Sequence, residues 1–202
     1  MPKALIINYD IGNLFSIKCS LERAGFSTNI CSDASQELEE ADAIILPGVG
    51  NFKAGAENLL GIRDRLVELI LGGRPVLGIC LGMQLFFEES EESPGRGLSI
   101  LSGKVVRLPP NVRVPHMGWN NLEVLSPSEI LEGISTADYF YFAHSYYAIP
   151  QKRNVISAET MYGVKFASVI VEKNIFGVQF HPEKSGRPGE RIIENFMRIV
   201  KR

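Results

Sequence analysis

One cysteine stands between two glycines at the point where an apolar strand should turn into a helix. Residues 75–79 form a short apolar run typical of a buried strand, and residues 81–90 have the spacing and composition of a helix. A turn this sharp leaves no space for β-carbons beside the nucleophile, and Gly78 and Gly82 have none. The stretch therefore predicts a nucleophile elbow that presents the sulfur of Cys80.

The predicted elbow also favours a reactive sulfur. Unpaired N–H groups and the helix dipole stabilise negative charge at the first turn of a helix, so Cys80 is expected to favour the thiolate over the thiol. The N–H of Leu81 would point at an oxyanion formed when the sulfur attacks a carbonyl carbon. The alternative for this motif taken alone is a buried structural cysteine at a glycine-rich strand end.

The remaining pattern predicts an α/β protein. The sequence has strand-like runs at 3–9, 26–31, 42–46, 75–79 and 139–147. The first four runs alternate with helical segments that end at about residue 24, at 71 and at 90. A last helix covers 191–202. Such alternation predicts a mostly parallel central sheet with helices on both faces, and the length of 202 residues suits one domain over 1–202. No G-x-G-x-x-G or Walker sequence supports a nucleotide site.

Composition excludes several other classes. The formal charge of -2 gives no net field for nucleic acid or an anionic membrane, so neither is an expected partner. No apolar run approaches the ~20 residues of a membrane span, and no signal-peptide pattern opens the chain, so we expect a cytoplasmic protein. The three cysteines, Cys19, Cys31 and Cys80, lack metal-ligand spacing, and no metal or other cofactor is expected.

A second segment should reach the same sheet edge as the elbow. The strand at 42–46 runs into Gly48, Val49 and Gly50, whose backbone N–H groups could complete an oxyanion hole. A plain tight turn is the alternative interpretation.

A histidine and a carboxylate follow the last strand. His181 and Glu183 are two residues apart, so both side chains would project from one face, with Pro182 fixing the backbone between them. The imidazole could take the thiol proton of Cys80 while the carboxylate holds its other nitrogen. Together with the elbow, this spacing predicts a site for thiol acyl transfer, and coincidence is the alternative.

Three other features stay open between a structural and a functional role. The acidic run at 88–92 is usual for a solvated helix end, although one carboxylate could hold a substrate ammonium group. Trp119 lies in an irregular Pro- and Gly-containing stretch and is either a core residue or an interface anchor. His144, within an aromatic strand, is more often a hydrogen-bonded structural residue than a catalyst.

These residues resemble the class I, triad-type glutamine amidotransferases over essentially the full chain. The signature is similar in Gly78-Ile79-Cys80-Leu81-Gly82-Met83-Gln84 and in His181-Pro182-Glu183. Three further segments resemble the branch of this family that serves histidine biosynthesis: Pro47-Gly48-Val49-Gly50, Pro115-His116-Met117-Gly118-Trp119-Asn120 and His144-Ser145-Tyr146. The resemblance implies a flavodoxin-like amidotransferase domain.

The resemblance also implies roles for individual residues. Cys80 matches the nucleophile, His181 the general acid and base, and Glu183 its orienting group. Val49 and Leu81, with Gly48 and Gly50, match the oxyanion hole. Residues that match glutamine-binding positions are Gln84, Glu92, Ser145 and Tyr146. Positions on the partner-facing side and at the ammonia exit are matched by Gly12, Asn13, Trp119, Tyr141 and Lys184.

The implied activity is hydrolysis of glutamine to glutamate and ammonia, with the ammonia passed to a TIM-barrel cyclase subunit in a heterodimer. The lack of a phosphate-cradling loop agrees with a phosphorylated substrate held by that partner. The alternatives are an amidotransferase subunit of another synthase, a stand-alone cysteine hydrolase or peptidase, and a binding subunit that has lost catalysis. Met83 weakens the first, because the amidotransferases of anthranilate and carbamoyl phosphate synthesis usually carry His there.

Overall fold

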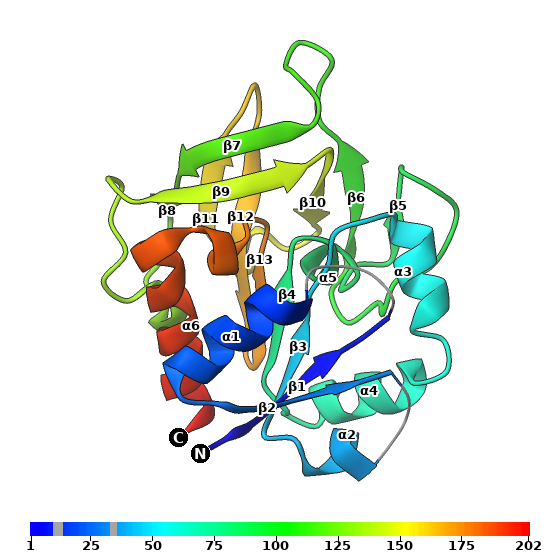
Figure 1. Ribbon diagram of the computed structural model, residues 1–202. Coiled ribbons are helices and arrows are strands. Elements are labelled where there is room, and N and C mark those ends of the chain that lie inside the picture. Colours follow the sequence, from blue (N-terminus) through cyan, green and yellow to red (C-terminus); the bar gives the residue numbers. More distant parts are fainter. Residues whose placement is uncertain (10–13, 33–35) are drawn as a thin grey trace.

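A computed structural model describes residues 1–9, 14–32 and 36–202. Its largest element is an eight-stranded sheet with the order β2-β1-β3-β4-β13-β12-β11-β8 (Figure 1). The five strands from β2 to β13 are parallel to one another, and β12, β11 and β8 continue the sheet in antiparallel fashion. The predicted α/β class and mostly parallel sheet are confirmed.

The elements of this sheet and its helices come from the whole length of the chain. The strands are β1 (Lys3–Ile7), β2 (Ser27–Cys31), β3 (Ala43–Leu46), β4 (Val76–Ile79), β8 (Glu123–Val124), β11 (Ile156–Met161), β12 (Lys165–Glu172) and β13 (Ile175–Val178). The helices are α1 (Leu14–Ala24), α2 (Gln36–Glu40), α3 (Phe52–Asn58), α4 (Arg63–Leu71), α5 (Leu81–Gln84) and α6 (Gly186–Val200), with 3-10 turns η1 (Glu129–Leu131), η2 (Arg153–Val155) and η3 (Pro182–Lys184).

Two smaller sheets lie beside the carboxyl end of the parallel strands. One has the order β10-β6-β5, from β10 (Tyr146–Pro150), β6 (Gly103–Arg107) and β5 (Glu89–Ser90). The other pairs β7 (His116–Asn121) with β9 (Tyr139–His144). None of the helices in the described part of the chain combines the length and apolar character that a membrane crossing needs.

The parallel strands are buried on both faces, as their continuous apolar runs predict. In β1, Leu5 and Ile7 join the core on one face, whereas Ala4 and Ile6 join the core on the other. Helices α1 and α6 cover the second face, and α2, α3 and α4 cover the first (Figure 1). The sheet is thus held between two apolar layers, and its carboxyl edge is left for loops.

Several predicted boundaries were wrong. The helix predicted at 57–71 is two helices. Helix α3 begins at Phe52 and is capped by Asn51, and helical structure is interrupted around Gly61 before α4 begins. The elbow helix predicted at 81–90 ends at Gln84, since Glu89 and Ser90 pair with β6 instead. The acidic run is therefore not a solvated helix end. The strand predicted at 139–147 divides at Ser145 between two sheets, and the last helix starts five residues earlier, at Gly186.

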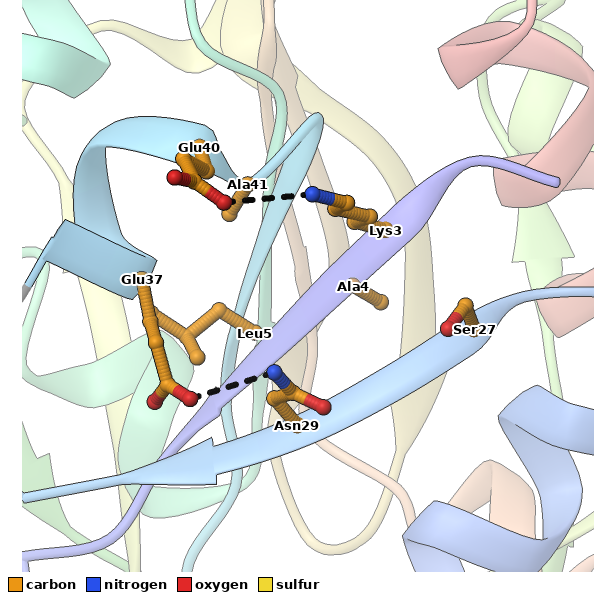
Figure 2. A pocket seen from close by; sticks show the side chains of 8 residues that line it. All are labelled: Lys3, Ala4, Leu5, Ser27, Asn29, Glu37, Glu40 and Ala41. Carbon is orange, nitrogen blue, oxygen red and sulfur yellow. Dashed lines mark hydrogen bonds and ion pairs between the residues drawn. The ribbon is translucent and has the colours of Figure 1, made fainter.

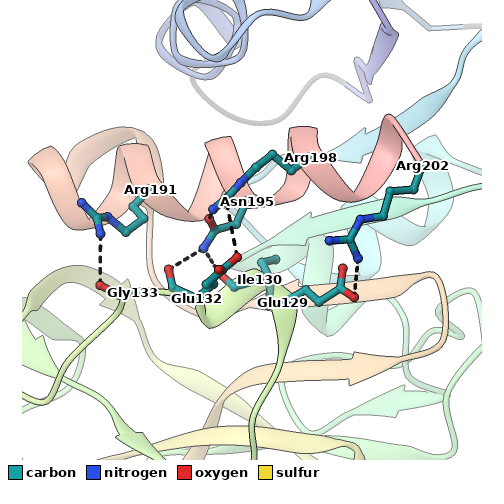
Figure 3. A network of polar contacts seen from close by, with 8 residues as sticks. All are labelled: Glu129, Ile130, Glu132, Gly133, Arg191, Asn195, Arg198 and Arg202. Carbon is teal, nitrogen blue, oxygen red and sulfur yellow. Dashed lines mark hydrogen bonds and ion pairs between the residues drawn. The ribbon is translucent and has the colours of Figure 1, made fainter.

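Helix α6 is attached to η1 by polar contacts along one side (Figure 3). The buried amide of Asn195 donates hydrogen bonds to the carbonyl oxygen of Ile130 (3.0 Å), within η1, and to that of Glu132 (2.9 Å), which follows it. More exposed contacts join Arg191 to Gly133, Arg198 to Glu132 and Arg202 to Glu129. Exposed ion pairs add little, so the buried amide is the main polar attachment.

The tightest backbone contact lies where α5 leaves the sheet. A β-carbon on Gly82 would lie 1.8 Å from the carbonyl oxygen of Leu46, in the neighbouring strand β3. A β-carbon on Gly78 would lie 2.7 Å from the backbone nitrogen of Met83. The elbow can therefore form only because both positions lack side chains, as the sequence predicts.

We predict that Gly82→Ala lowers the free energy of unfolding by roughly 3 kcal/mol or more, because neither backbone at this contact can move without disturbing the sheet. Gly61→Ala is the matched control, since a β-carbon there meets open space. Urea unfolding of both variants measures the difference. Equal midpoints would show that the contact with Leu46 is not restrictive.

Candidate active site

Cys80 occupies the turn between β4 and α5 in a strained conformation. Its φ of 53° and ψ of -107° are unusual for a residue with a side chain. The Cys80 N–H donates to the carbonyl oxygen of Val178 at 2.8 Å, and its own carbonyl accepts from the N–H of Gln84 at 3.1 Å. These bonds fix the turn between strand β13 and the first turn of α5.

His181 and Glu183 form a buried pair. The Nδ1 atom of His181 lies 2.9 Å from Oε1 of Glu183. The predicted reason was wrong, because β13 ends at Val178 and the two residues do not share a strand face. The 3-10 turn η3 instead folds Glu183 back onto the imidazole ring.

The Cys80 sulfur lies close enough to His181 to affect its charge. Burial alone would lower the pKa of His181, but contacts with Cys80 and with Glu183 raise it to about 10. Nε2 has no hydrogen-bond partner among the described residues, although it is buried. A buried nitrogen without a fixed partner suits proton transfer.

The two predicted oxyanion donors do not converge in this structure. The N–H of Leu81 donates to the carbonyl oxygen of Gly48 at 3.3 Å. Because a trans peptide directs its C=O and N–H to opposite sides, the N–H of Val49 points away from Leu81. The Gly48–Val49 peptide therefore covers the Leu81 donor and withholds its own.

The Tyr9 side chain contacts the 47–50 loop. Its hydroxyl group donates a hydrogen bond to the carbonyl oxygen of Pro47, and a β-carbon on Gly48 would lie 2.6 Å from that hydroxyl. Burial, with Cys80 nearby, raises the pKa of the Tyr9 phenol, so the hydroxyl remains a donor. Tyr9 was not among the predicted site residues, because in the sequence it resembles the last residue of an ordinary apolar strand.

A cavity of about 150 Å³ opens beside the sulfur. All four predicted glutamine-binding residues line it, and the complete lining is Val49, Gly50, Cys80, Leu81, Gln84, Glu92, Pro115, Ala143, His144, Ser145 and Tyr146. The carboxylate of Glu92 accepts the N–H of Phe52 at 2.6 Å, which ties it to the first turn of α3. The elbow, the 47–50 loop and the β9–β10 junction thus meet around one space.

A second pocket, of about 70 Å³, lies at the amino end of β1 (Figure 2). Four of its polar side chains are already paired: Lys3 contacts Glu40 at 3.2 Å, and Asn29 donates to Glu37 at 3.2 Å. It lies far from Cys80 along the strands and contains none of the predicted site residues.

His144, which lines the main cavity, forms a buried pair with His116. Nδ1 of His144 lies 2.9 Å from the carbonyl oxygen of Tyr146, and Nε2 lies 3.1 Å from Nδ1 of His116. His116 also stacks against the rings of Phe142 and Tyr162. Burial lowers the pKa of His144 to about 3 and that of His116 to about 4. Both rings are therefore neutral, which fits the structural role expected of His144.

Trp119 lies on strand β7, not in the irregular stretch that was predicted. It is 56% exposed, which excludes a core role in this chain. It pairs across the strands with Tyr141, and Nζ of Lys184 lies 5.8 Å from the Tyr141 ring centre. These three predicted interface residues are thus brought together, whereas Gly12 and Asn13 lie outside the described residues.

The sequence matches the family model for glutamine amidotransferase class-I over residues 5–200. The chain belongs to this family of enzymes. Within it, the chain is 49% identical over 201 residues to the imidazole glycerol phosphate synthase subunit HisH of Pyrococcus furiosus, covering 98% of this chain and 100% of that protein. The HisH subunit of Methanothermobacter thermautotrophicus is 47% identical, with 97% and 98% covered.

A solved structure supports the fold independently. The structure of PurLQS from Thermotoga maritima superposes with a TM-score of 0.80 at 18% sequence identity, covering 98% of this chain and 99% of that chain. At this identity the likeness concerns the fold alone.

We predict that stability falls as the pH drops below about 6.5. The unfolded chain then binds protons on His116 and His144 that the folded chain excludes, because their folded pKa values are depressed. Each excluded proton contributes a slope of about 1.4 kcal/mol per pH unit. His181, whose folded pKa is raised, is protonated in both states only well below its unfolded pKa of about 6.5, so it opposes this slope near pH 7 and adds none well below pH 6.

The measurement is urea unfolding between about pH 6 and pH 5 for the wild type and for His116→Gln. The free energy of unfolding of the variant should fall less steeply with pH, by about 1.4 kcal/mol per pH unit, which is the contribution of one proton. Identical slopes would show that His116 is not held neutral in the folded chain.

Proposed function

We propose that this chain is the glutaminase subunit of an imidazole glycerol phosphate synthase, hydrolysing glutamine to glutamate and ammonia. The observation that supports this most is the elbow cysteine beside the bonded pair His181 and Glu183, at the edge of a cavity lined by Gln84 and Glu92. The names of the relatives support the particular synthase.

In this proposal the Cys80 thiolate attacks the side-chain carbonyl carbon of glutamine, and the carbonyl oxygen becomes an oxyanion. His181 gives its proton to the leaving nitrogen, which departs as ammonia and leaves a γ-glutamyl thioester. Water then attacks the thioester, His181 takes its proton, and glutamate leaves as the thiolate re-forms. Glu183 holds the imidazole orientation through both steps.

Substrate binding is assigned to the cavity lining. The Glu92 carboxylate would hold the α-ammonium group of glutamine, since its anchoring to Phe52 leaves it fixed beside the cavity. Gln84, Ser145 and Tyr146 would supply the remaining polar contacts.

The ammonia requires a protected route. Free ammonia in neutral water is mostly ammonium, which has no lone pair with which to attack. We assign the exit to the surface around Tyr141 and Lys184, and the docking of a TIM-barrel cyclase subunit to the exposed Trp119 face of β7. Such a heterodimer would work in the cytoplasm, with glutamine as the substrate of this chain.

We predict that Cys80→Ala abolishes glutamine hydrolysis and leaves the fold and partner binding intact, because only the thioester step needs the sulfur. The synthase complex should still run on an added ammonium salt. Assays with glutamine and with ammonium separate the two. Glutamine-dependent turnover in the variant would show that another group is the nucleophile.

We further predict that the chain alone is a poor glutaminase, since the Gly48–Val49 peptide withholds one oxyanion donor and covers the other. A missing donor typically costs ~100-fold to 1000-fold in turnover. The partner and its phosphorylated substrate should raise turnover by stabilising a second orientation of this peptide, in which its N–H faces the oxyanion, up to their differential affinity for the two orientations. Steady-state rates with neither, with the partner, and with both measure this, and three equal rates would favour a stand-alone hydrolase.

Trp119→Ala should weaken association with the cyclase subunit by ~2 kcal/mol or more while changing the melting temperature of this chain little. The reason is its exposure in the chain alone. Titration of the partner and thermal unfolding test the two quantities separately. A large loss of stability with unchanged affinity would make Trp119 a structural residue.

A further inference from the structure

Gln179 is a polar residue in an apolar setting that the reaction above does not use. It is fully buried, directly after the last residue of β13. Strand β13 pairs in parallel with β4, with Val178 opposite Ile79, so the next residues along, Gln179 and Cys80, also lie side by side. A buried amide needs partners for both its oxygen and its nitrogen.

The direction of this amide follows from its neighbours. Nε2 of Gln84 lies 2.8 Å from the carbonyl oxygen of Tyr146, which can only accept, so Gln84 donates there. The same Gln84 nitrogen lies 3.1 Å from the Gln179 side chain and donates its second N–H to Oε1 of that residue. The nitrogen of Gln179 is therefore the atom on the other side.

That nitrogen faces the sulfur. Nε2 of Gln179 donates to Sγ of Cys80 at 3.5 Å. In the thiol form the sulfur has its own acceptor, the carbonyl oxygen of Ala143 at 3.9 Å. Once the proton has gone to His181, the N–H of Gln179 becomes a charge-assisted donor to the thiolate, and such bonds are the stronger ones.

The Tyr146 carbonyl fixes the whole arrangement. It accepts from Gln84 and also from Nδ1 of the neutral His144, at 2.9 Å. Nε2 of His144 in turn accepts from Nδ1 of His116. Because Gln84 donates to Oε1 of Gln179, reversing the Gln179 amide would place two donors against each other at Gln84.

We propose that Gln179 is a positioning residue that holds the Cys80 sulfur through its side-chain N–H and stabilises the thiolate, with its direction set by Gln84. The inference rests on the proposed function in that Cys80 is the nucleophile. It adds to the imidazole of His181 a second, uncharged stabilising group, which stays in place while His181 gives up and regains its proton.

The test is the pH dependence of Cys80 alkylation by iodoacetamide, followed peptide by peptide so that Cys19 and Cys31 are counted separately. Gln179→Met keeps the side-chain length and removes the donor. We expect its Cys80 rate at pH 7 to fall on the order of 10-fold, with the midpoint of the pH profile moved up by about one unit. Gln151→Met, at an exposed glutamine, is the matched control and should match the wild type.

The outcomes distinguish a failure of the proposed function from a failure of the inference about Gln179. If wild-type Cys80 reacts no faster than Cys19, the nucleophile is wrong and the proposed function fails with the inference. If wild-type Cys80 reacts fast and Gln179→Met has the same rate and midpoint, only the inference is overturned. A structural role alone would change stability and leave the midpoint unmoved.

A measurement on the wild-type chain covers the case in which Gln179→Met does not fold. In protein labelled with ¹⁵N at glutamine side chains, the Gln179 amide signals should shift on alkylation of Cys80 while those of Gln151 stay in place. Unshifted Gln179 signals would overturn the inference, because the N–H group would not then contact the sulfur.

Discussion

The contact between Gly82 and the carbonyl oxygen of Leu46 is the constraint on which the site depends. It lets α5 begin immediately beside β3, and this proximity holds Cys80 at a positive φ that an isolated chain would avoid. The strain is balanced by the surrounding sheet, whose strands β3, β4 and β13 are buried on both faces. As a result the sulfur is held at the carboxyl edge of the sheet, where several loops converge.

The groups around the sulfur differ in how firmly they are held. His181 is fixed by Glu183 at 2.9 Å, and the Gln179 amide by Gln84 at 3.1 Å. The Gly48–Val49 peptide is the exception, because its carbonyl oxygen accepts the hydrogen bond of the Leu81 N–H, which an oxyanion would need. Under the proposed function, the nucleophile is thus preformed and the oxyanion hole is unformed, an arrangement that would allow a partner to control turnover.

The sequence predicted the fold class and the elbow, because both depend on local pattern: apolar runs, glycine positions and helix spacing. It placed Glu183 beside His181 for the wrong reason, since a 3-10 turn and not a strand face joins them. It could not give the orientation of the Gly48–Val49 peptide, which depends on contacts with Tyr9 and Leu81 far along the chain. Gln179 was not predicted to be part of the site, because its role depends on Gln84, 95 positions away. A glutamine within an apolar run was the one feature of the sequence that could have indicated it.

The central claim, that Cys80 is the nucleophile of an acyl-transfer reaction, is tested most directly by trapping the intermediate. The complex would be quenched in acid during glutamine turnover, digested, and its peptides analysed by mass spectrometry. The account predicts a γ-glutamyl thioester on the peptide that carries Cys80 and on no other cysteine. A glutamyl adduct elsewhere, or turnover with no adduct on Cys80 under conditions that preserve thioesters, would contradict it.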